Sequence, residues 1–280
     1  MKWSRVLAVL CATAGTAAAD EIIVPNAAAT TAGSGGYSTL LRSAARSYQL
    51  VVGSGELGAL PQGSRITGIT WRRPTWQVHA AWPGVGFSCV FANYDITLST
   101  SSREPGNLST TYTDNIGPDA VLVRSGPMTF ADAFFPGGAL TPATNDFGEI
   151  VPFTTPYVYQ GGTLLLTVRH DGNNCGGSGS LDTVSSAQCQ AIGVSSYTQP
   201  DQWYAQGPIV MRLTFEAPAP CDPDVNCDGA VNGFDIQATE EAVNGDFSNF
   251  CQPSADLNGD GTENGFDIEA EEQRVNGAPC

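Results

Sequence analysis

The sequence is poor in basic residues. Its 280 residues include 12 Lys and Arg against 28 Asp and Glu, for a net charge of −16, and Lys2 is the only lysine. Because binding to a phosphate backbone requires clustered Lys and Arg, we expect no nucleic-acid partner. Charged residues make up only 14%, whereas there are 32 Gly and 18 Pro. This composition argues against a helical bundle and favours short strands joined by turns.

Long apolar runs are also missing. The longest near the start, Val6–Ala12, follows the basic residues Lys2 and Arg5 and precedes the small residues Ala17–Ala19. It is well short of the roughly 20 residues that span a bilayer, and no later segment is a better candidate. We therefore predict a signal peptide over residues 1–19 with cleavage near Ala19, no membrane span, and a secreted, extracellular or cell-surface protein.

Export permits disulfides. Without Cys11, seven cysteines remain, and four of them lie in the last 60 residues. Cys175 and Cys189 flank a Gly/Ser-rich loop and are candidates for a local pair, which leaves Cys89 as a buried strand thiol. The pairing of the last four stays open; one arrangement is Cys221–Cys280 with Cys227–Cys251.

The negative charge is concentrated at the C-terminal end. Residues 220–280 carry 14 acidic side chains and one Arg, a net of −13, whereas residues 1–219 carry 14 acidic and 11 basic side chains, a net of −3. The change coincides with a Pro/Ala stretch that is typical of a stiff linker. We predict a domain over residues 20–216, a linker over 217–220 and a second domain over 221–280.

The larger domain has the alternating pattern of strands. Tyr94, Ile96 and Leu98 alternate with polar residues. Similar runs bounded by Gly, Pro, Asn or Ser occur at 48–52, 65–71, 87–91, 120–124, 163–170 and 209–215. Helical periodicity is limited to a possible turn or two near Thr39–Arg46. The fold class we expect is mainly β: an antiparallel, jelly-roll-like β-sandwich followed by a small α-helical module.

The second domain contains an internal duplication. Residues 224–236 recur at 256–268 with an offset of 32 and 9 of 13 positions identical. Each copy has oxygen-bearing side chains at positions 1, 3, 5, 9 and 12, and Gly229 or Gly261 at position 6. A hard cation such as Ca²⁺ needs six to eight oxygen ligands, which a loop can supply from alternate positions only if it turns sharply in the middle.

We therefore predict two calcium ions, one per loop, rather than zinc, because neither loop contains His. Position 7 would contribute its backbone carbonyl and the other positions their side chains. The predicted ligands of the first loop are Asp224, Asn226, Asp228, Ala230, Asn232 and Asp235. Those of the second loop are Asp256, Asn258, Asp260, Thr262, Asn264 and Asp267.

These tandem loops, each followed by one predicted helix, resemble a dockerin, the calcium-dependent module that binds cohesin domains. The four cysteines make the segment similar to a cysteine-stapled variant of secreted planctomycete-type proteins. The resemblance implies a cohesin-like or other extracellular protein partner, contacted through positions 10 and 11 of each loop, Gly233 with Phe234 and Gly265 with Phe266. The alternative for both Phe residues is that they form the small core of the module. The glutamates of the predicted helices depart from the usual dockerin pattern.

No catalytic constellation stands out in the larger domain, which resembles uncharacterised secreted bacterial β-sandwich domains. Its carboxylates are scattered singly, and the histidines are limited to His79 and His170. Trp71, Trp76 and Trp82 could form an aromatic platform for carbohydrate, or could be core and rim residues. We expect a secreted, non-catalytic protein whose dockerin-like module anchors a binding or structural sandwich. The alternative is a polysaccharide-active glycoside hydrolase delivered by the same module.

Overall fold

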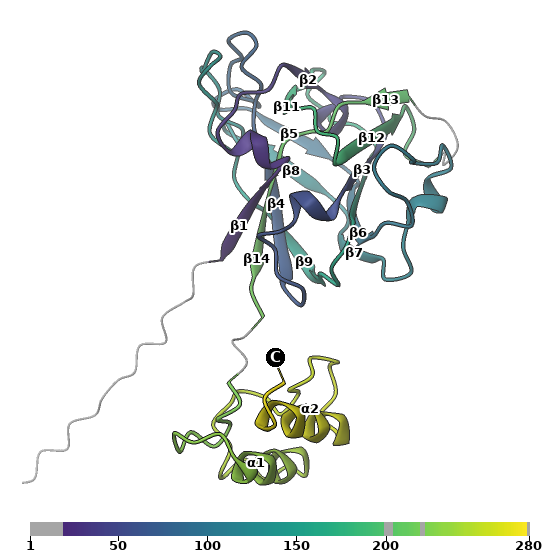
Figure 1. Ribbon diagram of the computed structural model, residues 1–280. Helices are drawn as coiled ribbons and strands as arrows, with labels where there is room; N and C mark the ends of the chain where they lie inside the picture. The colour runs from purple at the N-terminus through teal and green to yellow at the C-terminus, as the bar shows by residue number, and fades with distance from the viewer. Residues whose placement is uncertain (1–18, 199–203, 219–221, 279–280) are drawn as a thin grey trace, which may run out of the picture. The chain divides into compact units, whose positions relative to one another are not determined.

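The computed structural model describes residues 19–198, 204–218 and 222–278 (Figure 1). The chain divides into two compact units, Met1–Ala217 and Pro218–Cys280. The described strands belong to the first unit and the two α-helices to the second. This confirms the expected fold class, an antiparallel β-sandwich followed by a small helical module. Most of the predicted signal peptide, residues 1–18, lies outside the described residues, and no described helix is long and apolar enough to cross a membrane.

The sandwich is built from a four-stranded and a six-stranded antiparallel sheet. The first has the order β1 (Asp20–Val24), β14 (Met211–Glu216), β4 (Arg65–Trp71) and β9 (Val151–Val158). The second has the order β13 (Tyr204–Gln206), β12 (Cys189–Val194), β3 (Arg46–Val52), β10 (Leu164–His170), β6 (Tyr94–Thr100) and β7 (Val121–Arg124). Two small sheets pair β2 (Gly35–Tyr37) with β11 (Leu181–Thr183) and β5 (Ser88–Phe91) with β8 (Met128–Ala131).

From β3 to β10 the long strands alternate between the two large sheets along the chain, and β12, which follows β10, stays in the six-stranded sheet. β3, β6 and β10 belong to the six-stranded sheet, whereas β4, β9 and β14 belong to the four-stranded one. The last strand, β14, lies between the first strand and β4, with Asp20 opposite Phe215 and Trp71 opposite Met211. The first and last strands of the sandwich are therefore neighbours in one sheet.

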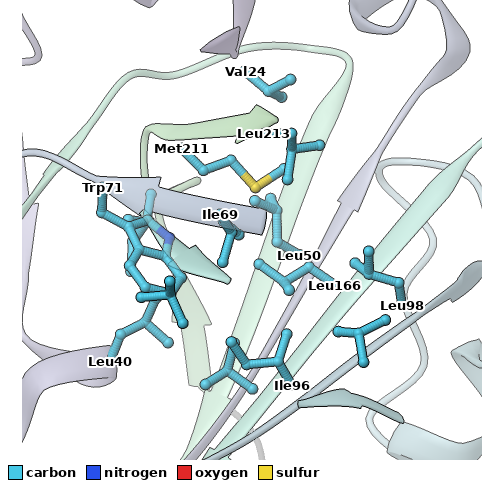
Figure 2. Close-up of a cluster of buried hydrophobic side chains, with 14 of the residues drawn as sticks. Val24, Leu40, Leu50, Ile69, Trp71, Ile96, Leu98, Leu166, Met211 and Leu213 are labelled. Carbon is cyan, nitrogen blue, oxygen red and sulfur yellow. The ribbon is translucent and has the colours of Figure 1, made fainter. Parts of the chain in front are cut away.

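The core lies between the two large sheets. Figure 2 shows Ile69, Trp71 and Leu213 from the four-stranded sheet and Leu50, Ile96 and Leu166 from the six-stranded sheet in one cluster. All of these side chains are at most 1% exposed. Side chains along a strand point alternately to its two faces, so every second one points into this layer. This is why an alternating sequence pattern predicts strands here.

The burial of Trp71 corrects one sequence-based expectation. Its side chain has no exposed surface, so it cannot stack on a sugar ring. Trp82 is partly buried and packs against the core, near Phe135 at a ring-centroid distance of 6.1 Å. Trp76 remains half exposed, at 49%. The three tryptophans therefore do not form a common exposed platform.

The cysteines of the sandwich pair differently from the expectation. Cys89 of β5 forms a disulfide with Cys175, across 86 residues of sequence. Cys189, at the start of β12, is the free and buried cysteine. The predicted Cys175–Cys189 pair and the predicted Cys89 thiol are thus both wrong. The disulfide joins the two-stranded β5–β8 sheet to the loop that follows β10, which local loop composition does not reveal.

The helical module contains α1 (Gly233–Val243) and α2 (Gly265–Val275). Its small apolar core consists of Val225, Ala238, Ala242, Phe250 and Ala255. The disulfide Cys227–Cys251 is present as proposed from the sequence. The other proposed pair, Cys221–Cys280, lies outside the described residues. So small a core needs additional cross-links to hold a fold.

Candidate calcium-binding loops

The first residue of each loop organises the turn at its centre. The Asp224 carboxylate accepts hydrogen bonds from the Asp228 amide at 3.0 Å and from the Gly229 amide at 2.9 Å. Asp256 accepts from the Asp260 and Gly261 amides at the same two distances. Gly229 and Gly261 have φ values of 88° and 89°, a left-handed conformation that favours glycine. The sharp turn predicted at position 6 is therefore present in both loops.

The middle positions form tight side-chain turns. The side-chain Oδ1 of Asn226 accepts from the Asp228 amide at 2.9 Å, and Asp228 Oδ1 accepts from the Ala230 amide at 2.9 Å. In the second loop, Asp260 Oδ1 accepts from both the hydroxyl and the amide of Thr262. These two bonds, the hydroxyl first, lower the pKa of Asp260 below its ordinary value, so this exposed carboxylate stays charged.

Positions 9 and 12 of each loop also begin the helix that follows. Asn232 caps α1 by accepting from the Phe234 amide, while Asp235 Oδ2 accepts from the Asn232 amide at 2.8 Å. Asn264 and Asp267 form the same reciprocal pair at the start of α2. This is a capping box, and it places a carboxylate at the positive end of each helix dipole.

The two carboxylates at position 12 also close their loops. Asp235 Oδ1 accepts from the Asn226 amide at 3.3 Å, and Asp267 Oδ1 accepts from the Asn258 amide at 3.1 Å. Both side chains are fully buried. Each loop is thus tied at both ends to the first turn of its helix, and the loop and helix form one structural unit.

The chemistry of each loop fits a hard cation. Five oxygen-bearing side chains and the carbonyl of position 7 lie within one 12-residue turn, and carboxylate, amide and backbone carbonyl oxygens are the ligands that Ca²⁺ takes. Among the residues that the structure describes, no cluster of three or more His, Cys, Asp or Glu side chains is arranged to hold a metal. The fit therefore rests on the mixed Asp and Asn donors and on the shape of the turn.

Phe234 and Phe266 lie on the surface beside the two loops. Their side chains are 67% and 66% exposed, respectively. The alternative that these residues form the core of the module is therefore wrong, because Phe250, at 8% exposed, takes that role. Position 11 of both repeats presents an aromatic ring to solvent, where a partner can bury it.

A buried ion pair in α2 was not expected from the sequence. Glu271 is fully buried, and its Oε2 lies 3.6 Å from the guanidinium of Arg274. The pKa of Glu271 is raised to about 7. Burial is the main cause; the charge of Arg274 opposes the rise, and the charge of Asp235 adds to it. One feature of the sequence points to a special role for Arg274: it is the only basic residue in an otherwise acidic segment of 61 residues, 220–280.

The histidines of the sandwich do not form an acid–base pair with neighbouring carboxylates. His170 is fully buried; its Nε2 lies 2.7 Å from the Thr39 carbonyl, and its Nδ1 accepts from the Gly172 amide at 3.1 Å. Burial lowers the pKa of His170 to about 4, which keeps the ring neutral. His79 lies against Trp76, with the ring centroids 5.2 Å apart.

The helical module thus consists of two loop–helix units with oxygen donors at matching positions. Residues 222–276 match the Dockerin type I domain, which confirms the resemblance carried by the two loops. Dockerin type I domains bind calcium and mediate protein–protein interaction, and proteins that carry them are typically extracellular, which the disulfides fit. No curated protein and no solved structure matches the chain.

Proposed function

We propose that residues 224–235 and 256–267 bind one calcium ion each and that the ordered module attaches the β-sandwich to an extracellular, cohesin-like protein. The ligands are the five Asp and Asn side chains of each loop together with the carbonyl of Ala230 or Thr262. Bound calcium would neutralise the clustered carboxylates and fix the loops. Weak sites of about 10⁻⁴ to 10⁻³ M suffice for an extracellular module.

The exposure of Phe234 and Phe266 is the observation that carries the partner-binding part of this proposal. Two rings that are about two-thirds exposed, each following a glycine and each at the start of a helix, occupy equivalent positions of the two repeats. Aromatic side chains of this kind are common anchors in protein interfaces. Because the pair occurs twice, either repeat can supply the contact.

We propose that the sandwich is a secreted, non-catalytic binding or structural domain, released from its signal peptide near Ala19. The engagement of both His170 ring nitrogens with the backbone supports this assignment. Trp76 is the exposed tryptophan of the three considered for carbohydrate binding. The competing function, polysaccharide hydrolysis, is tested by the release of reducing sugar from a panel of polysaccharides.

The test of the anchoring role uses the immobilised full chain and the secreted and envelope fractions of the source organism. We expect a partner that is retained with Ca²⁺ and released by chelator. The matched variants are Phe234→Ala/Phe266→Ala, which should lose the partner while still binding calcium, and Phe247→Ala, which should retain it. Retention by the double variant, or retention in chelator, would contradict the proposed contact.

A further inference from the structure

The two loops have identical residues at their five side-chain ligand positions but differ at position 4. This position is Cys227 in the first loop, with φ of 57°, and Gly259 in the second, with φ of 73°. Left-handed backbone suits glycine and disfavours residues that carry a Cβ. Position 4 of the first loop therefore carries a side chain in a backbone conformation that disfavours one. Another interaction must stabilise this conformation.

The first loop is held by a covalent link. Cys227 forms a disulfide with Cys251, which belongs to the segment that connects α1 to α2. The Cys251 amide also donates to the Val225 carbonyl at 2.8 Å. These two connections anchor residues 225 and 227, which alternate with the ligand positions 224, 226 and 228. Residues 256–267 contain no cysteine, so the second loop cannot be held in this way.

The second loop is held by polar contacts instead. The Arg274 guanidinium donates to the Leu257 carbonyl at position 2 of the loop and pairs with the buried Glu271. The Glu263 carboxylate accepts from the Ser254 hydroxyl at 2.8 Å and from the Ala255 amide at 3.0 Å. These contacts join the second loop to α2 and to the segment that precedes it.

The first repeat has no counterparts of these polar contacts. The residues 32 positions before Arg274, Glu271 and Glu263 are Ala242, Thr239 and Val231. Ala242 and Val231 have no polar side-chain atoms, and the Thr239 hydroxyl donates to the Asp235 carbonyl within its own helix. The two repeats thus share their ligands and helix caps but not these additional contacts, which position only one loop each.

We propose that the two loops are unequal calcium sites, the first positioned covalently through Cys227–Cys251 and the second by the Arg274 side chain. This inference rests on the proposed calcium binding. A cross-linked loop has already lost conformational freedom that the other loop loses only when the ion binds, so it binds more tightly. Residues that support metal ligands typically change affinity by about 10–100-fold when they are removed.

The experiment measures calcium affinity by titration calorimetry on the full chain, with one loop disabled at a time. Asp256→Ala/Asp260→Ala leaves the first loop, and Asp224→Ala/Asp228→Ala leaves the second. Combining all four substitutions gives the blank for calcium bound elsewhere on the chain. Comparing the two single-loop proteins measures the inequality directly.

Each supporting contact is then removed in each single-loop protein. We expect Cys227→Ser/Cys251→Ser to weaken the first loop by about tenfold or more and the second by less than about twofold. We expect Arg274→Met to show the reverse pattern. The helical circular dichroism signal at saturating Ca²⁺ shows that each variant still folds.

A further variant separates the covalent link from the unfavourable backbone conformation. Cys227→Gly/Cys251→Ser gives the first loop the residue that the second loop has, without the disulfide. We expect its affinity to stay below that of the parent. Affinity equal to the parent's would show that the link contributes nothing and would overturn the covalent part of the proposal.

Two results overturn the inference as a whole. Equal weakening of both loops by both variants would show a general loss of the fold, and equal affinities of the two intact loops would show that the sites are not unequal. A different result, no calcium bound by the parent chain beyond the blank, would overturn the proposed calcium function itself, so the two failures are distinguishable.

Discussion

Thr239 and Glu271 occupy the same position in the two repeats, 32 residues apart, and both side chains are completely buried. The Thr239 hydroxyl donates to the Asp235 carbonyl at 3.0 Å, whereas neither carboxylate oxygen of Glu271 makes a hydrogen bond in the described structure. The same buried position therefore contains a hydrogen-bonded hydroxyl group in the first repeat. In the second repeat it contains a carboxyl group whose polar partner is the ion-paired Arg274. This difference predicts a pH dependence.

Without calcium, Glu271→Gln should stabilise the helical module increasingly as the pH rises from about 4.5 to about 7. The folded-state pKa of Glu271 is raised to about 7, mainly by burial. As the pH rises, Glu271 therefore ionises first in the unfolded chain, and the free energy of unfolding of the parent falls over this interval. We expect a difference of about 1–2 kcal/mol above pH 7 and none below about pH 4. Urea unfolding in chelator, followed by helical circular dichroism, measures it.

The control for this prediction is Glu272→Gln at the neighbouring exposed position. It removes the same charge without a buried carboxyl group. Parallel pH profiles for the parent and the Glu271→Gln variant would contradict the assignment.

Asp235 and Asp228 should separate the scaffold role of a loop carboxylate from its role as a ligand. Asp235 is buried and accepts two backbone amides, so Asp235→Ala should lower the free energy of unfolding by about 2 kcal/mol even in chelator. Asp228 is exposed, so Asp228→Ala should cost about 0.5 kcal/mol or less in chelator. Both variants should weaken calcium binding in a titration. Equal stability losses in chelator would be inconsistent with this division.

Phe250 and Phe234 should differ sharply in their contribution to folding. Phe250→Ala removes a buried ring from a core of few residues and should cost about 3 kcal/mol. Phe234→Ala and Phe266→Ala should change the free energy of unfolding by no more than about 0.5 kcal/mol, because their rings are exposed. Denaturant unfolding with Ca²⁺ present compares the three variants. A large loss for Phe234→Ala would place its ring in the fold rather than in an interface.

Cys189 should be unreactive in the folded protein. The residue is 7% exposed, and burial raises the pKa of its thiol to about 12, so little thiolate forms at neutral pH. We expect iodoacetamide to label it only after unfolding, as read by mass spectrometry of peptides. Rapid labelling of Cys189 in the native chain, with the Cys89–Cys175 peptides still linked, would contradict the described burial.

Many strands of the sandwich were predictable because they bury at least the face that points into the core. β4 follows the predicted run 65–71 residue for residue, and β10 matches 163–170 to within one residue. The alternating pattern does not reveal β9, because Pro152 and Pro156 interrupt it. An edge strand tolerates proline, which has no backbone N–H to donate to a neighbouring strand. Near Thr39, one short 3₁₀ segment, Thr39–Leu41, replaces the longer helical turn that the sequence indicated.

The loops of the module were predictable at the level of position, because cation ligands and caps recur at fixed offsets. Of their supports, the Cys227–Cys251 disulfide was proposed from the sequence, whereas the Arg274 contact was not. Arg274 contacts a carbonyl 17 residues earlier, and Cys89 finds Cys175 at a distance of 86 residues. Contacts of this kind depend on how elements pack, and no local pattern encodes them. The same reason explains why Trp71 proved to be a core residue and not a surface one.

The place of β14 between β1 and β4 also fixes when the sandwich can be finished. In the four-stranded sheet, β1 pairs with β14 alone, so its ladder of hydrogen bonds must wait until Glu216 has been synthesised. Completion of the four-stranded sheet is therefore the last folding step open to residues 20–216, because β1 has no partner strand until β14 has left the ribosome.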